Sequence, residues 1–294
     1  MLVKDVMRLP HRRLAEGDIG LEIEVEGRRL PIPNKYWRCD RDGSLRGEES
    51  MEYVLDKPSS LQTVEDALQN LQLCYKANQT RIDETVRAGV HVHINCQKLT
   101  LTELYKFFVL YLVLENILIK YCGEYREGNL FCLRCQDAEF LLYTLIRAAK
   151  ERNFLGRFHN DDIRYASMNV KALGDYGSLE FRAMRSTKDL GAILDWVKIL
   201  LNLREVSKEF DSPVQIIEQV SGMGRKAFLE KCLGPFANFF NGVAGVDDLL
   251  AEGVQLAQCL AYCVNWNTWD NPIFIGGVEF PNDGRFHEEP LEDY

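Results

Sequence analysis

The sequence predicts an α+β fold in which a largely antiparallel β-sheet carries helices on one face. Several short segments alternate apolar and polar residues with a period of two, which is typical of strands with one dry and one wet face. Longer segments repeat apolar residues at helical spacing. Several joins are shorter than the roughly dozen residues that a parallel crossover needs, so neighbouring strands should run antiparallel.

The first strand is expected at residues 18–26, where apolar and acidic residues alternate and Gly20 is the one exception. A glycine and two arginines then turn the chain into a second short strand at 30–33, which residues 36–39 could extend. Both strands should present one apolar face to the core.

The middle of the chain alternates between helices and strands. An Asp-Gly-Ser turn at 42–44 precedes a strand at 50–55. A helix from residue 59 or 60 to about 77 follows, with serine as its N-cap. A strand at 89–95 and a long helix from residue 100 or 102 to about 121 complete this part.

The second half is mostly helical. A helix at 137–151 precedes a predicted β-hairpin of strands 163–171 and 177–184. From a helix at 190–210 onward the pattern is mainly helical to about 263. We therefore expect two units: a sheet-bearing domain at residues 1–210, and a helical C-terminal extension at 211–294 that packs on it and ends in an irregular tail.

Composition narrows the class of protein. The net charge of −9 among 294 residues argues against nucleic acid as a partner, because no long basic run is present. Nine irregularly spaced cysteines indicate free thiols in a reducing cytoplasm. The most apolar helix, at 107–119, contains Glu115 and is too short for a membrane span, so it reads as a buried core helix.

Three predicted strands each carry two functional side chains on one face. These are Glu22 and Glu24, His91 and His93, and Glu180 and Arg182. Side chains at positions i and i+2 point to the same side of a strand, and the residues between them are apolar in every case. Glu52 and Asn169 can join the same polar face from neighbouring strands.

If the three strands share one sheet, the carboxylates crowd together, because adjacent strands lie about 4.8 Å apart. Unpaired carboxylates at such distances repel one another, and divalent cations remove that repulsion. A set dominated by oxygen ligands suits Mg²⁺ or Mn²⁺, with two or more ions as our expectation. The alternative to a metal site is a purely structural role for all three pairs. The acidic residues would then form a solvated face of the sheet, the two histidines would be structural or exposed, and the glutamate and arginine of the third strand would be a surface ion pair.

Six short motifs occur in an order that resembles a known family of enzymes. They are Gly20-Leu21-Glu22-Ile23-Glu24, Asp42-Gly43-Ser44-Leu45, Met51-Glu52-Tyr53-Val54, Gly89-Val90-His91-Val92-His93, Arg164-Tyr165-Ala166-Ser167-Met168-Asn169 and Leu179-Glu180-Phe181-Arg182. The series resembles the amidoligases of the glutamine synthetase and glutamate–cysteine ligase superfamily, many of them from phages and bacteria. The resemblance spans about residues 17–187.

The resemblance implies a curved antiparallel sheet whose concave face holds ATP and Mg²⁺ or Mn²⁺. It implies an ATP-dependent ligase that joins a small-molecule or peptide carboxylate to an amine through an acyl phosphate. By matching motifs, the metal ligands implied are Glu22, Glu24, Glu52, His91 and Glu180.

The resemblance also implies catalytic roles for three residues. Arg182 would meet the transferred phosphoryl group, His93 would support the site or touch substrate, and Glu180 would act with them. Further contacts to substrate or nucleotide are implied for Asp42, Arg126, Arg164 and Asn169.

Other readings of the same residues remain open. Guanidino kinases share a similar sheet, so phosphoryl transfer to a guanidinium or amine is an alternative reaction. A scaffold that keeps the sheet for binding, and a metallohydrolase, are further alternatives. The sequence names neither substrate nor general base, and the helical part after residue 210 could cover the sheet or join subunits of a homo-oligomer.

Overall fold

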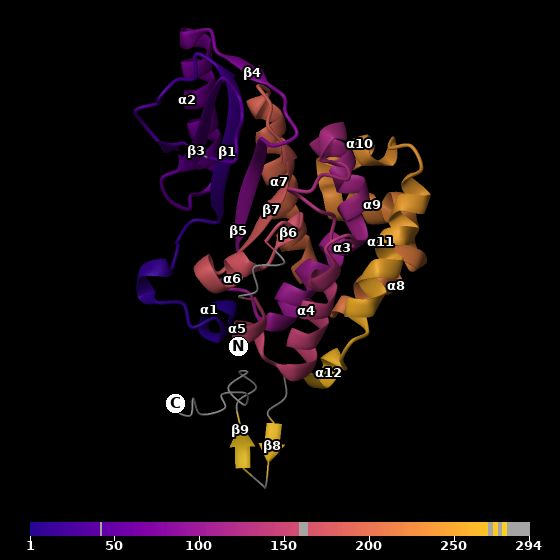
Figure 1. Ribbon diagram of the computed structural model, residues 1–294. Helices are drawn as coiled ribbons and strands as arrows, with labels where there is room; N and C mark the ends of the chain where they lie inside the picture. Colours follow the sequence, from indigo (N-terminus) through magenta and orange to yellow (C-terminus); the bar gives the residue numbers. More distant parts are fainter. Residues whose placement is uncertain (42, 159–163, 270–272, 276–277, 281–294) are drawn as a thin grey trace.

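The protein has a β-sheet layer and a thick helical layer (Figure 1). The structure is a computed structural model, and it describes residues 1–41, 43–158, 164–269, 273–275 and 278–280. The main sheet has seven strands in the order β2-β3-β1-β5-β7-β6, with β4 paired to β1 beside this path. Every pairing in it is antiparallel, and the sheet is open, so the predicted fold class is confirmed.

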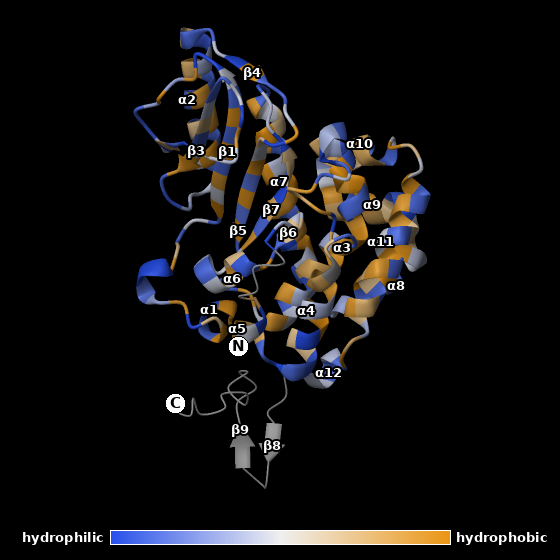
Figure 2. Cartoon of the chain, in the orientation of Figure 1, coloured by the Kyte–Doolittle hydropathy of each residue, from blue (hydrophilic) through white to orange (hydrophobic). Residues whose placement is uncertain are grey.

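The strands of the main sheet are two to ten residues long. Their bounds are β1 Ile19–Arg28, β2 Trp37–Asp40, β3 Glu49–Leu55, β4 Arg81–Asp83, β5 Gly89–Asn95, β6 Met168–Asn169 and β7 Ser178–Arg185. A separate hairpin pairs β8 Ile273–Ile275 with β9 Val278–Phe280. The alternation of polar and apolar residues along the central strands is visible in Figure 2.

Helices cover the apolar face of the sheet. The long helices that contact its strands are α2 Leu61–Asn78, α3 Leu101–Cys122 and α7 Leu190–Lys208. Each begins at a side-chain cap: the N-cap residues Ser60, Thr100 and Asp189 accept hydrogen bonds from N–H groups of the first turn. At Thr100 the cap is reciprocal, because Glu103 also accepts from the Thr100 N–H.

The remaining helical elements lie at the N-terminus, between β5 and β7, and in the C-terminal part. They are α1 Val3–Val6, η1 His11–Arg13, η2 Glu124–Arg126, α4 Glu139–Glu151, α5 Phe154–Phe158, α6 Lys171–Tyr176, α8 Pro213–Met223, α9 Arg225–Leu233, η4 Gly234–Phe236, α10 Ala237–Asn241, α11 Val246–Ala261 and α12 Trp266–Trp269. Among the residues that the structure describes, no helix combines the length and apolar character that a bilayer crossing requires.

Helix α3 is the centre of the molecule. Residues 107–114 are all buried, as the sequence predicts for a core helix, and α11 packs along the side of α3 away from the sheet. A glycine permits this close packing: a Cβ built at Gly253 of α11 would lie only 2.2 Å from the carbonyl oxygen of Val113. The crossing of α3 and α11 therefore depends on the missing side chain.

Two predicted elements differ in the structure. The strand predicted at 30–33 is wrong: these residues are irregular, and β2 begins only at Trp37. Pro31 and Pro33 lack the N–H groups that a ladder needs, and the Pro31 carbonyl instead accepts a hydrogen bond from the Tyr53 hydroxyl.

The predicted hairpin pairs antiparallel as expected, but its details differ. Its first strand is only the two residues of β6, and the connection to β7 is the short helix α6 rather than a tight turn. The β8–β9 hairpin follows α12, and the end of the tail, for which an irregular conformation is expected, lies at residues 281–294, outside the described part of the chain.

Candidate functional site

The register of the strands arranges the polar face in rows that cross the sheet. Residues directly opposite one another in an antiparallel pair share a face. In the row nearest the start of β1, Gly20 is opposite His93, His93 is opposite Glu180, and Glu180 is opposite Asn169. Three strands, β5, β7 and β6, thus contribute side chains to one line, and β1 adds only the backbone of Gly20.

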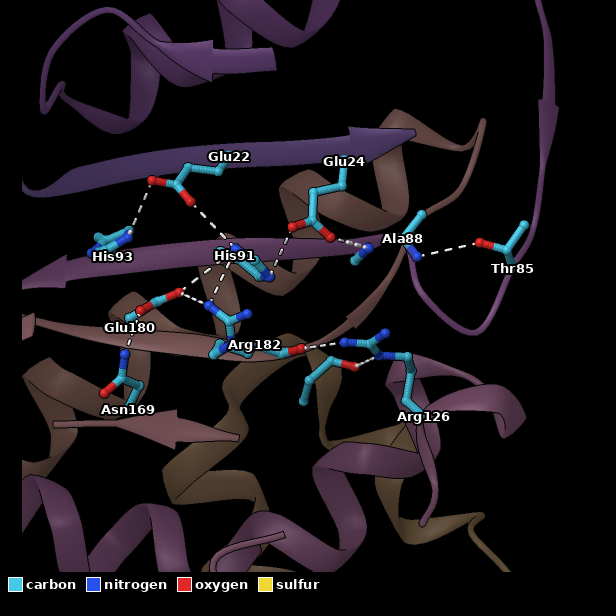
Figure 3. Close-up of polar contacts among 12 residues, drawn as sticks. Glu22, Glu24, Thr85, Ala88, His91, His93, Arg126, Asn169, Glu180 and Arg182 are labelled. Atoms are coloured by element: carbon cyan, nitrogen blue, oxygen red, sulfur yellow. Dashed lines mark hydrogen bonds and ion pairs between the residues drawn. The ribbon is translucent and has the colours of Figure 1, made fainter. Parts of the chain in front are cut away.

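The next rows add the other acidic residues. Glu22 of β1 is opposite His91 of β5, and Glu24 is opposite Glu52 of β3. An irregularity in the β5–β7 ladder lies between Val90 and Val92, next to His91. The strands that carry the predicted pairs are therefore adjacent, and their polar sides coincide, as Figure 3 shows.

His91 occupies the middle of the cluster and is buried. Its Nδ1 lies 3.3 Å from Glu22 Oε2 and 3.6 Å from Glu180 Oε1, and its Nε2 lies 3.8 Å from Glu24 Oε1. One imidazole therefore faces three carboxylates from two strands (Figure 3). Such a position suits a residue that holds negative groups together, with or without a bound cation.

A second histidine belongs to a group of potential metal ligands among the described residues. One ligand atom each of Glu22, His93 and Glu180 lie within 4.8 Å of one another. His93 Nε2 is 3.7 Å from Glu22 Oε1, and its Nδ1 is 3.2 Å from the Ser178 hydroxyl. The serine orients the ring, which leaves Nε2 directed at the carboxylates.

Glu180 is held from both sides. Its Oε1 accepts a hydrogen bond from Arg182 Nη1, and its Oε2 accepts one from Asn169 Nδ2 at 2.6 Å. The Arg182 Nη1 is also 3.5 Å from His91 Nδ1. The Nε of Arg182 is buried and has no hydrogen-bond partner among the described residues, so the guanidinium keeps an N–H that an anion could take.

The charges in the cluster shift its pKa values in opposite directions. Burial would raise the pKa of Glu22, but hydrogen bonds from His91 and His93 hold it well below the usual range. Burial likewise opposes ionisation of Glu180, and the charges of His93 and Arg182 lower its pKa nonetheless. The pKa of His93 is raised: burial lowers it, but the hydrogen bond to Glu22 and the negative charges of Glu180 and Glu22 together outweigh burial.

The end of the cluster at Glu24 is built by backbone contacts. Glu24 is buried and its Oε2 accepts the Gly89 N–H at 3.0 Å. Arg126, expected at the substrate, is instead 1% exposed and donates to the carbonyl oxygens of Ala183 and Arg182, at 3.1 and 2.7 Å. The guanidinium thus supports strand β7 from beneath the site (Figure 3).

One of the predicted contact residues is not gathered with the others. Arg164 is exposed, with its guanidinium carbon 5.1 Å from the centre of the Tyr165 ring. Asp42 lies outside the described residues. By contrast, Glu52 and Asn169 are in register with Glu24 and Glu180.

Sequence reasoning missed two side chains that organise the site. Ser178 orients His93, and Glu26 accepts the backbone N–H groups of Arg46 and Gly47, which ties the loop after β2 to β1. Glu26 continues the acidic alternation of β1, so its position could have been read from the pattern. Ser178 had no such signal, because a single serine at the start of a strand is common.

The fold and the cluster together define a class: an α+β protein whose open antiparallel sheet gathers carboxylates, imidazoles and a guanidinium on its uncovered face. Comparison with known proteins gives the family. A family model described as "Putative amidoligase enzyme" matches residues 54–204, more than half of the chain, and the chain belongs to this family. The resemblance seen in the motifs is therefore confirmed, and the family points to a ligase.

The family match has a definite extent. It includes the strands that carry His91, His93, Glu180 and Arg182, whereas β1 with its acidic residues precedes it. No curated protein matches the chain.

Proposed function

We propose that the protein is an ATP-dependent carboxylate–amine ligase that forms an amide through an acyl phosphate and uses two or more divalent cations. The observation that carries this proposal is the convergence of Glu22, His93 and Glu180 within 4.8 Å, beside Arg182. Family membership supports the ligase reaction. The three side chains come from three different strands. A solvated acidic face would not require side chains of different strands to converge.

The chemistry of the donor set fits a hard divalent cation. Glu22 and Glu180 offer carboxylate oxygens and His93 one imidazole nitrogen, a combination that Mn²⁺ and Mg²⁺ accept. Glu24 and Glu52 could hold a second ion in the adjacent row, with His91 between the two groups. Bound ions would neutralise charge on phosphoryl oxygens.

The chain's own residues explain the remaining requirements. The Arg182 guanidinium is anchored on Glu180 through Nη1, and its buried Nε, which has no partner among the described residues, would donate to the γ-phosphoryl group of ATP. Asn169 holds the other oxygen of Glu180 and keeps that carboxylate from rotating. His91 keeps Glu22, Glu24 and Glu180 in place around it.

The reaction then has two steps. A substrate carboxylate attacks the γ-phosphorus of ATP, which gives an acyl phosphate and ADP. The amine attacks the acyl carbon, and inorganic phosphate leaves as the amine gives up a proton. Positioning and charge neutralisation are the main contributions that such a site can make, because phosphoryl transfer needs little covalent help from the protein.

The test is ATP turnover with Mg²⁺ or Mn²⁺ and a panel of carboxylates and amines. Glu180→Gln should lower cation-dependent turnover about a hundredfold or more, whereas the exposed Glu218→Gln, a matched change on α8, should not alter it. Product analysis distinguishes the reactions: a ligase releases phosphate with a new amide, and a kinase leaves a phosphorylated product. Full activity of Glu180→Gln, or no cation-dependent binding of ATP by calorimetry, would refute the proposal.

A further inference from the structure

The ladder between β5 and β7 contains a β-bulge at the candidate site. Between two regular pairs of this ladder, β5 has the single residue His91, whereas β7 has two residues, Arg182 and Ala183. A bulge of this kind bends the strand and changes the direction of its side chains, and bulges are frequent beside active sites. The irregularity next to His91 therefore has a definite form, with the extra residue on β7.

The bulge decides where the polar alternation of β7 stops. Glu180 and Arg182 share the polar face, and in a regular strand Met184 would follow them there. Met184 is instead fully buried and belongs, with its neighbour Ala183, to the hydrophobic core. The extra residue therefore places Met184 in the core and Arg182 at the bend of the strand.

A bulge leaves backbone groups without ladder partners, and here one arginine binds them. Arg126 donates from Nη2 to the Arg182 carbonyl at 2.7 Å and from Nε to the Ala183 carbonyl at 3.1 Å (Figure 3). On the side of β6, the Arg182 N–H donates to the Ser167 carbonyl at 2.8 Å. The backbone of Arg182 is thus held at both its N–H and its carbonyl group.

The start of β5 leaves room for the Arg126 guanidinium. A Cβ built at Gly89 would lie 2.9 Å from Arg126 Nη2, so glycine is the residue that lets the buried guanidinium fit. The Gly89 N–H donates to Glu24 of the acidic cluster at 3.0 Å. The planar fork of arginine suits two neighbouring carbonyl groups, because its N–H groups have fixed directions.

The guanidinium of Arg182 depends on this backbone geometry. Its Nη1 donates to Glu180 and lies 3.5 Å from His91 Nδ1. A displacement of the bulge by about 1 Å would misplace the guanidinium, and a misplacement of that size in an active site can cost about a hundredfold in rate.

We infer that Arg126 is a positioning residue for the candidate site: it fixes the bulge at Arg182 and Ala183 and thereby aims the Arg182 guanidinium. Arg126 itself donates to backbone groups behind the polar face, so it acts through Arg182. The inference rests on the proposed function in one respect, because the contact between Arg182 and a phosphoryl group belongs to that proposal.

The direct test observes the Arg182 guanidinium by NMR without ATP. In protein that contains isotope-labelled arginine, buried Nε–H groups give side-chain signals, and Arg182→Lys identifies the signal of Arg182. Arg126→Ala should shift this signal or broaden it beyond detection, while the backbone amide signals of α8 and α11 stay in place. An Arg182 signal that is unchanged in Arg126→Ala would overturn the inference.

Two milder variants decide the question if Arg126→Ala fails to fold. Gly89→Ala keeps every charge and the N–H to Glu24, yet its methyl group displaces the guanidinium, so it should also shift the Arg182 signal. Arg126→Lys keeps the positive charge but offers one nitrogen for two carbonyl groups, so it should not restore the wild-type signal. Gly222→Ala, at an open position of α8, is the matched control for Gly89→Ala. A wild-type Arg182 signal in both milder variants would refute the positioning role.

Turnover then measures whether the position of Arg182 matters for the reaction. Arg126→Ala should lower kcat for cation-dependent ATP turnover about 10–100-fold and change KM for ATP by less than about threefold. In an Arg182→Ala background the same substitution should have little further effect, because the group that Arg126 positions is absent. An equal loss in both backgrounds would show that Arg126 contributes only to general stability, and the inference would fail.

The two measurements separate this inference from the proposed function. An Arg182 signal that depends on Arg126, in a protein without cation-dependent ATP turnover, would refute the ligase and retain Arg126 as the residue that positions Arg182. Turnover that survives in Arg126→Ala, together with an unchanged Arg182 signal, would refute the positioning role alone.

Discussion

The replacement of Glu115 by alanine should be one of the most damaging single changes outside the polar face. Glu115 lies on α3 and is 1% exposed. Both of its carboxylate oxygens are 2.9 Å from the Cys135 N–H, and Oε1 also accepts a hydrogen bond from the Ser167 hydroxyl. The same serine's carbonyl accepts the Arg182 N–H at 2.8 Å, so the network lies directly behind the candidate site.

The magnitude follows from what alanine would leave behind. The Cys135 N–H would be buried without its acceptor, which costs about 1–3 kcal/mol. The Ser167 hydroxyl would keep only the weaker contacts to Tyr111 and to the Cys135 sulfur, which adds roughly 1 kcal/mol. We expect Glu115→Ala to lower the free energy of unfolding by about 3 kcal/mol. Glu115→Gln keeps one acceptor oxygen and should cost about 1 kcal/mol or less.

The sign of the pH dependence is a second part of this prediction. Burial raises the pKa of Glu115, even though hydrogen bonds from Ser167 and Cys135 oppose the shift. A carboxyl whose folded pKa exceeds its unfolded value stabilises the fold fully below the unfolded pKa, and this stability is lost as pH rises through the folded pKa. Relative to wild type, Glu115→Gln should therefore become more stable as the pH rises above about 4.3, the ordinary value for glutamate.

Urea denaturation of the three proteins at several pH values measures both effects. The midpoint should move without a change in the slope, because the same surface is exposed on unfolding. If alanine and glutamine cost the same, the hydrogen-bond argument is wrong. If the difference between wild type and Glu115→Gln does not depend on pH, the raised pKa is wrong.

Three further predictions concern the site and its support. Ser178→Ala should release the His93 ring and weaken Mn²⁺ binding about 10–100-fold by calorimetry, and unchanged affinity would show that the serine does not position the ring. Millimolar Mg²⁺ or Mn²⁺ should raise the melting temperature, because a cation at a hundredfold excess over its Kd adds about 2.7 kcal/mol to the free energy of unfolding. Glu180→Gln should remove this rise. An identical rise in both proteins would place the cations elsewhere. Gly253→Ala should lower the free energy of unfolding by about 1–3 kcal/mol, because the added methyl group overpacks the α3–α11 crossing. Gly222→Ala, with open space around it, should change the free energy of unfolding little. Equal melting temperatures for the two variants would mean that the helices separate without penalty.

The polar face of the sheet was predictable because strand periodicity is local. Alternation alone placed Glu22, Glu24, His91, His93 and Glu180 on wet sides of strands, and the structure brings those sides together. The register between strands was not predictable in this way, because it depends on contacts between residues far apart in the sequence. The sequence therefore could not show that His93 forms a compact group of potential ligands with Glu22 and Glu180.

The other differences also have tertiary causes. The Nε and Nη2 of Arg126 donate to two carbonyl groups of β7, and nothing in the neighbourhood of this residue along the chain indicates that contact. The α6 helix replaces a turn because the Gly-Asp-Tyr-Gly pattern is compatible with either. The two prolines at 31 and 33 argue against a strand at 30–33, because proline has no N–H to donate to a ladder.

The burial of α3 on all sides makes the two halves of the chain thermodynamically interdependent. Its sheet-facing residues are covered by sequence elements on both sides of it, and its opposite side is covered by α11, which comes more than a hundred residues later. A fragment that stopped at residue 210 would lack α11 and leave the side of α3 near Val113 without its cover, and exposed apolar surface of this kind promotes self-association. The stability of the candidate site therefore depends on a contact made by the last third of the polypeptide.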